Sequence, residues 1–184
     1  LYRFEVHTAG GLGQATLLWS RDNAWEAWTL QPDGASALRV AEGSGLVDGD
    51  LVELRGEITD APDAAAILSA TDFTPSTARM GVLALLEDRG LSSDGLSRIY
   101  ALRDPSGALL QVDWAALGSP AAGLLRVRRW SGLLRTRAGV TRYPVEDGLE
   151  VELSGTFRAG DWWQYPARRA DPRGLAACAP HGPE

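Results

Sequence analysis

The sequence contains no lysine, so that all 18 of its basic residues are arginine. It has a single cysteine, Cys178, and two histidines, His7 and His181, which lie near opposite ends of the chain. One cysteine excludes an internal disulfide bond, and no Cys/His cluster surrounds it to hold a metal. With so few histidines and cysteines, a Ser-His-Asp or Cys-His catalytic arrangement is also not expected. We therefore expect a protein that is not an enzyme and that uses no cofactor or metal.

Long hydrophobic runs are also missing. No apolar stretch approaches the roughly 20 residues that a membrane-spanning helix needs, so we expect no membrane span. No signal peptide is visible, and the cytoplasm is the expected location, although a chain that starts at Leu1 leaves a removed leader open. A length of 184 residues suits one large domain or two small ones.

The charge is negative overall and unevenly distributed. A net charge of −6 argues against a general polyanion binder. Residues 1–80 carry five arginines and twelve acidic residues, whereas residues 81–184 carry thirteen arginines and twelve acidic residues. An anion-binding site is therefore expected in the second half of the chain.

A repeat is the strongest pattern present. The pentapeptide VELRG at 52–56 returns as VELSG at 151–155. Two further pairs of segments match in the same order, namely ALRVAEGSGL with LLRVRRWSGL and LLWSRD with IYALRD. Three matches in one order predict a tandem duplication. We expect copies at 1–78 and 83–176, followed by a flexible tail at 177–184.

Within each copy the hydrophobic residues alternate with polar ones. Val52 and Leu54 alternate with Glu53, and Val151 and Leu153 repeat the pattern, which is typical of strands with one buried face. The acidic residues between them are expected on the outer face. The predicted strands are 1–8, 14–21, 25–30, 50–58 and 66–74 in the first copy, and 83–88, 96–103, 109–114, 149–158 and 163–170 in the second. The connections 33–42 and 118–128 leave room for a short helix.

Two segments carry a resemblance to a known fold. SRIYALRDPSGALLQVDW resembles strand 2, turn and strand 3 of an OB-fold, and GDLVELRGEI resembles its strand 4. The resemblance covers nearly the whole chain, twice. It implies an all-β protein of two tandem OB-like five-stranded Greek-key barrels, the second with an extra β-hairpin at about 133–144. It also implies a binding face for single-stranded nucleic acid on strands 2 and 3 and on the loops that join strands 1 and 2 and strands 4 and 5.

The second copy has the residues that such a face needs, because single-strand sites combine stacking aromatic rings with cations. The first copy is acidic at the matching positions and lacks the aromatic residues. The candidate binding residues are Arg126, Arg128, Arg129, Trp130, Arg135, Arg137, Arg142, Tyr143, Trp162, Trp163, Tyr165, Arg168 and Arg169.

The same residues suit a second class of function. Trp and Arg dominate protein-protein hot spots, so this surface also fits a protein-interaction or assembly subunit, with a protein partner or self-association. The net charge of −6 and the absence of lysine favour this alternative. Trp162 and Trp163 are adjacent, so in a strand one faces inward and the other outward. The sequence leaves both functions open.

Overall fold

The chain is described here from a computed structural model, which covers residues 1–56, 81–117, 125–146 and 148–166 and the backbone of 175–177. The described structure is all-β, as predicted, with one short helix, α2 (Trp114–Leu117). Among the described residues, no helix is long and apolar enough to cross a membrane.

The chain forms two compact units, and one is inserted into the other. Residues 26–129 form the first, here named the barrel unit. Residues 1–25 and 130–184 together form the second, here named the sheet unit. These boundaries differ from the predicted copies at 1–78 and 83–176.

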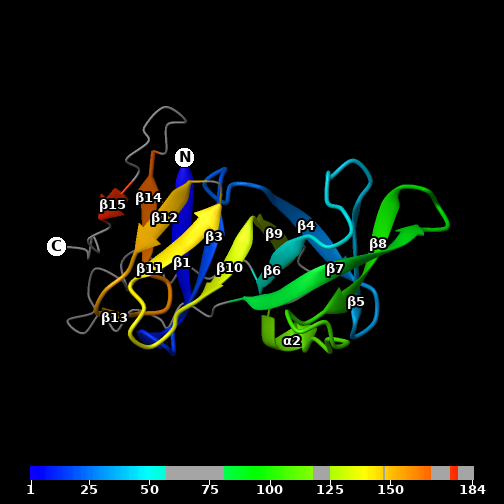
Figure 1. The fold of residues 1–184 in the computed structure, drawn as a ribbon. Helices are drawn as coiled ribbons and strands as arrows, with labels where there is room; N and C mark the ends of the chain where they lie inside the picture. Colours follow the sequence, from blue (N-terminus) through cyan, green and yellow to red (C-terminus); the bar gives the residue numbers. More distant parts are fainter. Residues whose placement is uncertain (57–80, 118–124, 147, 167–174, 178–184) are drawn as a thin grey trace, which may run out of the picture. The chain divides into compact units, whose positions relative to one another are not determined.

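The barrel unit is a closed six-stranded barrel in the order β4-β5-β8-β7-β6-β9 (Figure 1). Its strands are β4 (Ala27–Pro32), β5 (Ala37–Ala41), β6 (Leu51–Gly56), β7 (Val82–Leu91), β8 (Ser97–Arg103) and β9 (Leu125–Trp130). β5 pairs with β8 and β6 pairs with β7, so strands from both predicted copies share one barrel. The predicted tandem OB-like barrels are therefore not confirmed. Alternation in sequence reports which face of a strand is buried, but it does not report which strand lies beside it.

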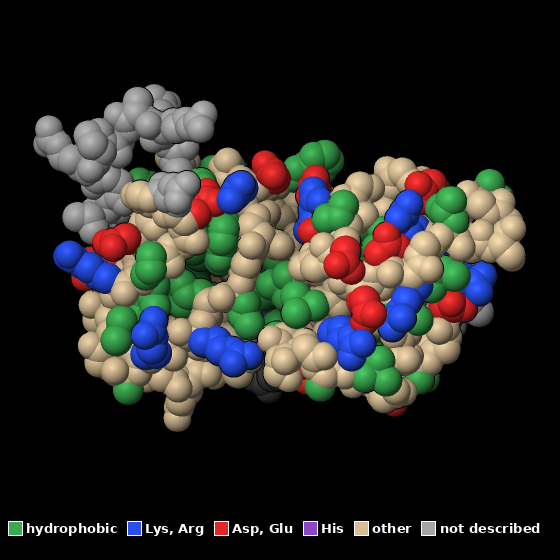
Figure 2. Space-filling model, turned by 45° about the vertical axis from the view of Figure 1, so that its right-hand side comes forward, with side chains coloured by type: hydrophobic (Ala, Val, Ile, Leu, Met, Phe, Trp, Pro, Cys, Tyr) green, Lys and Arg blue, Asp and Glu red, His purple; other side chains and the backbone are tan. Residues whose placement is uncertain are grey.

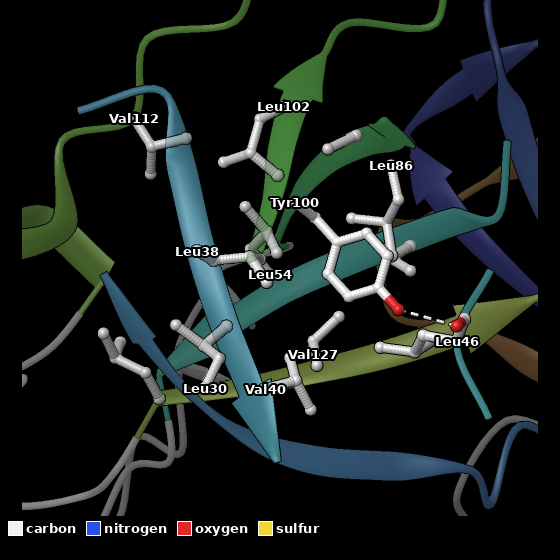
Figure 3. Close-up of a cluster of buried hydrophobic side chains, with 13 residues drawn as sticks. Leu30, Leu38, Val40, Leu46, Leu54, Leu86, Tyr100, Leu102, Val112 and Val127 are labelled. Carbon is white, nitrogen blue, oxygen red and sulfur yellow. Dashed lines mark hydrogen bonds between the residues drawn. The ribbon is translucent and has the colours of Figure 1, made fainter. Parts of the chain in front are cut away.

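The barrel is filled by aliphatic side chains from all six strands around one tyrosine (Figure 3). Tyr100 is fully buried, and its hydroxyl donates a hydrogen bond of 2.6 Å to the carbonyl oxygen of Leu46. A buried hydroxyl without a partner costs free energy, so this bond removes a penalty. It also ties the connection after β5 to the barrel interior.

Glu53 corrects an expectation. The alternation places it on the outer face of β6, yet its side chain is fully buried. The Gly81 N–H donates to Glu53 Oε1 at 2.9 Å. A Cβ at position 81 would lie 2.4 Å from the Leu54 carbonyl oxygen, so only glycine permits this close approach of the backbone. Glu53 is therefore a hydrogen-bonded structural group rather than a solubilising surface charge.

The sheet unit consists of three small sheets around a second core. The sheets are β10-β3-β1-β14, β11-β12-β15 and β13-β2, and β12 runs parallel to β15. The strands are β1 (Tyr2–Thr8), β2 (Gly10–Gly11), β3 (Thr16–Ser20), β10 (Gly132–Arg135), β11 (Arg142–Glu146), β12 (Leu149–Glu152), β13 (Thr156–Phe157), β14 (Trp162–Tyr165) and β15 (Leu175–Ala177). The core is formed chiefly by Phe4, Val6, Leu17, Trp19, Leu134, Tyr143, Val151, Leu153, Phe157 and Trp163.

Residues 133–144 do not form the predicted hairpin. β10 pairs with β3, whereas β11 pairs with β12 in a different sheet. Thr136 anchors the connection, because its backbone N–H and its hydroxyl both donate to the Ala15 carbonyl oxygen, at 3.0 and 2.8 Å. Leu134 and Tyr143 enter the core. The segment is thus part of the sheets that enclose the core rather than a protruding insertion.

The structure also differs from the prediction at several other predicted strands and connections. The predicted strand 109–114 contributes one isolated bridge, between Leu109 and Arg103, before α2 begins. The predicted connection 33–42 contains β5, and the described part of the connection 118–128 belongs to β9. The predicted strand 66–74 and all of the predicted tail except Ala177 lie outside the described residues.

The strand phase of the repeat can be tested by mutation. Leu153 is buried in the sheet unit. Glu152 is exposed, and its Oε2 atom lies 3.7 Å from Arg142 Nε. We expect Leu153→Ala to lower the free energy of unfolding by about 2–5 kcal/mol. Glu152→Ala should change it by less than about 0.5 kcal/mol, because exposed ion pairs contribute little. Urea unfolding curves of the two variants measure the difference, and equal effects would show that the phase is wrong.

Candidate functional site

The structure divides the predicted binding residues between the two units. Arg126 and Arg129 lie on β9 of the barrel unit. Arg126 Nη1 donates to Thr29 Oγ1 at 2.8 Å. Arg129 Nε donates to Glu26 Oε2 at 2.7 Å, and its guanidinium lies 5.9 Å from the Trp28 ring centroid. These arginines brace neighbouring strands of the barrel.

The third arginine of this run, Arg128, is half-buried on β9 and also has an interaction partner. Each of the three arginines therefore already interacts with another group of the protein. These arginines lie on β9 of the barrel unit and Trp162 lies on β14 of the sheet unit, so one binding face that joins them stays a prediction.

Three predicted aromatic residues are buried in the sheet unit. Trp130, Tyr143 and Trp163 are 2%, 2% and 8% exposed. The Tyr143 hydroxyl accepts from the Arg137 N–H at 2.8 Å and donates to the Val140 carbonyl oxygen at 2.7 Å, so it closes the turn between β10 and β11. These rings have structural roles, and they offer no face on which a base can stack.

The remaining predicted residues are more accessible. Arg135 and Arg137 are exposed, and neither forms an ion pair with another described residue. Arg142 is exposed beside Glu152, and Tyr165 is half-buried. Arg168 and Arg169 lie outside the described residues.

Trp162 is the aromatic side chain of the predicted set that is presented to solvent, with 48% of its surface exposed. It lies on β14 directly opposite Glu5 of β1, on the sheet face away from the core. The Arg3 guanidinium lies 4.4 Å from the Trp162 ring centroid. Glu5, which is 4% exposed, accepts from Arg3 Nε at 3.1 Å and Nη2 at 2.9 Å. The nearly buried carboxylate of Glu5 thus positions the guanidinium of Arg3, which in turn contacts the indole of Trp162.

Sequence reasoning identified Trp162 but missed Arg3 and Glu5. The alternation of β1 does place both on its polar face. Their neighbour, however, is a strand about 160 residues further along the chain, and no local pattern gives that pairing.

A second charged site was also missed, at one mouth of the barrel. In three chain segments a buried side chain and a charged one lie two positions apart, and side chains two apart share a strand face. The pairs are Val40 and Glu42, Leu86 and Asp88, and Tyr100 and Arg98. In the strand register Arg98 lies opposite Val40, and Asp88 lies opposite Tyr100. The charged side chains therefore continue the inward-facing rows of the core.

These residues and the connection 42–48 line a pocket of about 330 Å³. Arg98 Nη1 lies 2.5 Å from Asp88 Oδ2, and Arg98 Nε lies 3.3 Å from Glu42 Oε2. Hydrogen bonds to both carboxylates raise the pKa of Arg98. Asp48 also lines the pocket and accepts from the Asp88 N–H at 2.9 Å. The pocket thus holds three carboxylates and one guanidinium.

Other charged side chains of the barrel unit also form ion pairs. Arg103 pairs with Glu87 at 2.7 Å, and Arg39 pairs with Asp33 at 2.8 Å. Figure 2 shows arginine and acidic side chains side by side at its right-hand side, where strands of the barrel unit lie in Figure 1. At the barrel mouth, three carboxylates line one pocket together with a single arginine, Arg98.

In comparisons with known proteins, no family model, no curated protein and no solved structure matches the chain. Within the described residues, no group of three or more His, Cys, Asp or Glu side chains is arranged to hold a metal ion. The functional inference therefore depends on the Trp162 surface and the barrel mouth.

The ion pairs at the barrel mouth predict a pH dependence. The Gly90 N–H, followed by Arg98, lowers the pKa of Asp88. A carboxyl whose pKa is lower in the folded state contributes stability above its unfolded pKa of about 3.9, and this stability is lost as the pH falls through the folded value. Asp88→Asn should therefore destabilise the barrel at pH 7, and the difference from the wild type should shrink below about pH 4.

Urea unfolding at a series of pH values measures this difference. Glu150→Gln, at an exposed position of β12, is the matched control and should follow the wild type throughout. A wild-type advantage over Asp88→Asn that stays constant down to pH 2 would contradict the assignment.

Proposed function

We propose that the protein is a non-catalytic protein-interaction subunit that uses the Trp162 surface of its sheet unit. The observation that carries the proposal is the arrangement of Trp162, Arg3 and Glu5. A large indole is half-exposed, and yet it is fixed by an arginine that a nearly buried carboxylate positions. Gln164, two residues along β14, donates to Asn23 Oδ1 at 2.5 Å and further restrains this edge.

This arrangement supports protein binding for an energetic reason. Ordering a flexible side chain at an interface costs about 0.5–1.5 kcal/mol, and an indole that is already held in place avoids much of that cost. Trp and Arg are also the residues most enriched among protein hot spots. The sheet unit carries nine acidic residues and nine arginines, so it has no net charge that would repel a protein partner of either sign.

Single-stranded nucleic acid is a second candidate ligand, and one observation favours it. Arg135 and Arg137 are exposed, they form no ion pair with another described residue, and they belong to the same unit as Trp162. Cations together with an exposed ring are the minimum that a single-strand site requires. The proposal is weakened because Trp130, Tyr143 and Trp163, the other rings predicted to stack, are buried.

The protein-interaction proposal predicts a selective effect of one tryptophan. Trp162→Ala should weaken a specific stoichiometric complex with a copurifying protein by about 30-fold or more in affinity, as for a hot spot of about 2 kcal/mol. Trp25→Ala is the matched control, because Trp25 is 73% exposed in the same unit. Isothermal titration with the recovered partner measures both variants. Equal loss in the two variants would contradict a site at Trp162.

The nucleic-acid candidate predicts two different thermodynamic effects. Each arginine-phosphate contact contributes about 0.7 to the salt slope for a single strand, so Arg135→Ala with Arg137→Ala should flatten the slope by about 1.4. Trp162→Ala should weaken binding by about 1–3 kcal/mol at an unchanged slope, because stacking releases no counterions. Tryptophan fluorescence titrations with a single-stranded oligonucleotide measure both effects. A wild-type protein that shows no quenching at low salt would eliminate this candidate.

A further inference from the structure

We propose that the barrel mouth binds an arginine side chain from the β10–β11 turn of a second copy of the chain, which produces head-to-tail self-association. The inference does not rest on the proposed function, because it uses neither Trp162 nor Arg3. It connects two features of opposite charge that the contacts described above leave unbalanced.

The first feature is the composition of the mouth. Glu42, Asp48 and Asp88 line the pocket together with one cation, Arg98. Arg98 is shared between Glu42 and Asp88. The four side chains together carry a net charge of −2 at neutral pH. The pocket volume of about 330 Å³ lies at the lower end of the range for ligand-binding pockets. Its size and charge suit a guanidinium group, whose planar donors match carboxylate oxygens.

The second feature is the rim of the mouth. Val47, Leu91 and Leu96 are 56%, 52% and 72% exposed. Val47 lines the pocket, Leu91 lies opposite Arg98 in the strand register, and the Leu96 carbonyl accepts from the Glu42 N–H at 3.0 Å. Exposed apolar side chains beside a charged pocket provide area that a protein partner buries, whereas a small free cation leaves it in water.

The third feature is a source of arginine in the same sequence. Arg135 and Arg137 flank Thr136, which is 6% exposed and hydrogen-bonded to Ala15. The Arg137 N–H is held by the Tyr143 hydroxyl. Both arginine side chains are exposed and form no ion pair with another described residue. Two cations are thus presented on a turn whose backbone is fixed on both sides, so that little conformational entropy is lost when they bind.

The charge distribution between the units agrees with this pairing. The barrel unit carries fifteen acidic residues and nine arginines, so the whole net charge of −6 belongs to it. A contact between the mouth of one copy and the turn of another joins two different surfaces. Repeated between copies, such a contact produces a reciprocal dimer, a ring or a chain.

Sedimentation of the purified protein tests the proposal. At low salt the weight-average mass of the wild type should rise with concentration above that of a monomer, and at about 0.5 M salt the protein should become a monomer, because screening weakens ion pairs between exposed charges. Arg135→Ala with Arg137→Ala should remain a monomer, and so should Glu42→Gln with Asp48→Asn. Arg158→Ala and Glu150→Gln, at exposed positions of the sheet unit, are controls that should associate like the wild type.

Mixing the two defective proteins provides the decisive measurement. One variant keeps an intact mouth and the other keeps intact arginines, so an equimolar mixture should form a heterodimer and nothing larger. Leu96→Arg adds a cation at an exposed rim position and should block association without altering the barrel core, which covers the case in which the carboxylate variant does not fold. A wild type that is monomeric at every concentration, or a mixture of variants that stays monomeric, would overturn the proposal.

Discussion

The pairing of β4 with β9 is the constraint on which the architecture depends. Ala27 lies opposite Arg128 in this ladder, so the chain enters and leaves the barrel on adjacent, antiparallel strands. The Arg129 N–H also donates to the Glu26 carbonyl oxygen at 3.1 Å, next to the point of insertion. The two ends of residues 26–129 therefore lie side by side within the barrel unit. Domain insertion is tolerated where the ends of the inserted unit are close together.

The sequence allowed the faces of the strands to be predicted but not their partners. Val52, Leu54, Val151 and Leu153 are all buried, which confirms the phase of the repeat. Their strands, β6 and β12, nevertheless belong to different units with different topologies. Alternation records burial on one side of a strand, and a duplicated pattern can meet that requirement in two unlike sheets. Glu53 shows a further limit, because the close approach of Gly81 that covers it arises from the tertiary fold.

For the candidate sites, too, the sequence predicted local features but not the tertiary contacts. Adjacency predicted that Trp162 and Trp163 would face opposite sides, but which ring faces outward depends on the register of β14 against β1, where Trp163 lies opposite the buried Phe4. The run of arginines at 126–137 reads as one basic segment, and the boundary between the units separates its first half from its second. At the barrel mouth, Glu42 and Asp88 lie far apart in sequence, and they meet only because β5, β8 and β7 are consecutive in the barrel.

The insertion also has a consequence for the order in which the chain matures on the ribosome. β1 and β3 are synthesised before the barrel, but their partners β14 and β10 emerge only after it. The barrel is a contiguous segment, so it can close while the later strands are still being translated. Until then, β1 and β3 lack these partners, and apolar side chains such as Phe4 and Leu17 lack the complete core that later buries them.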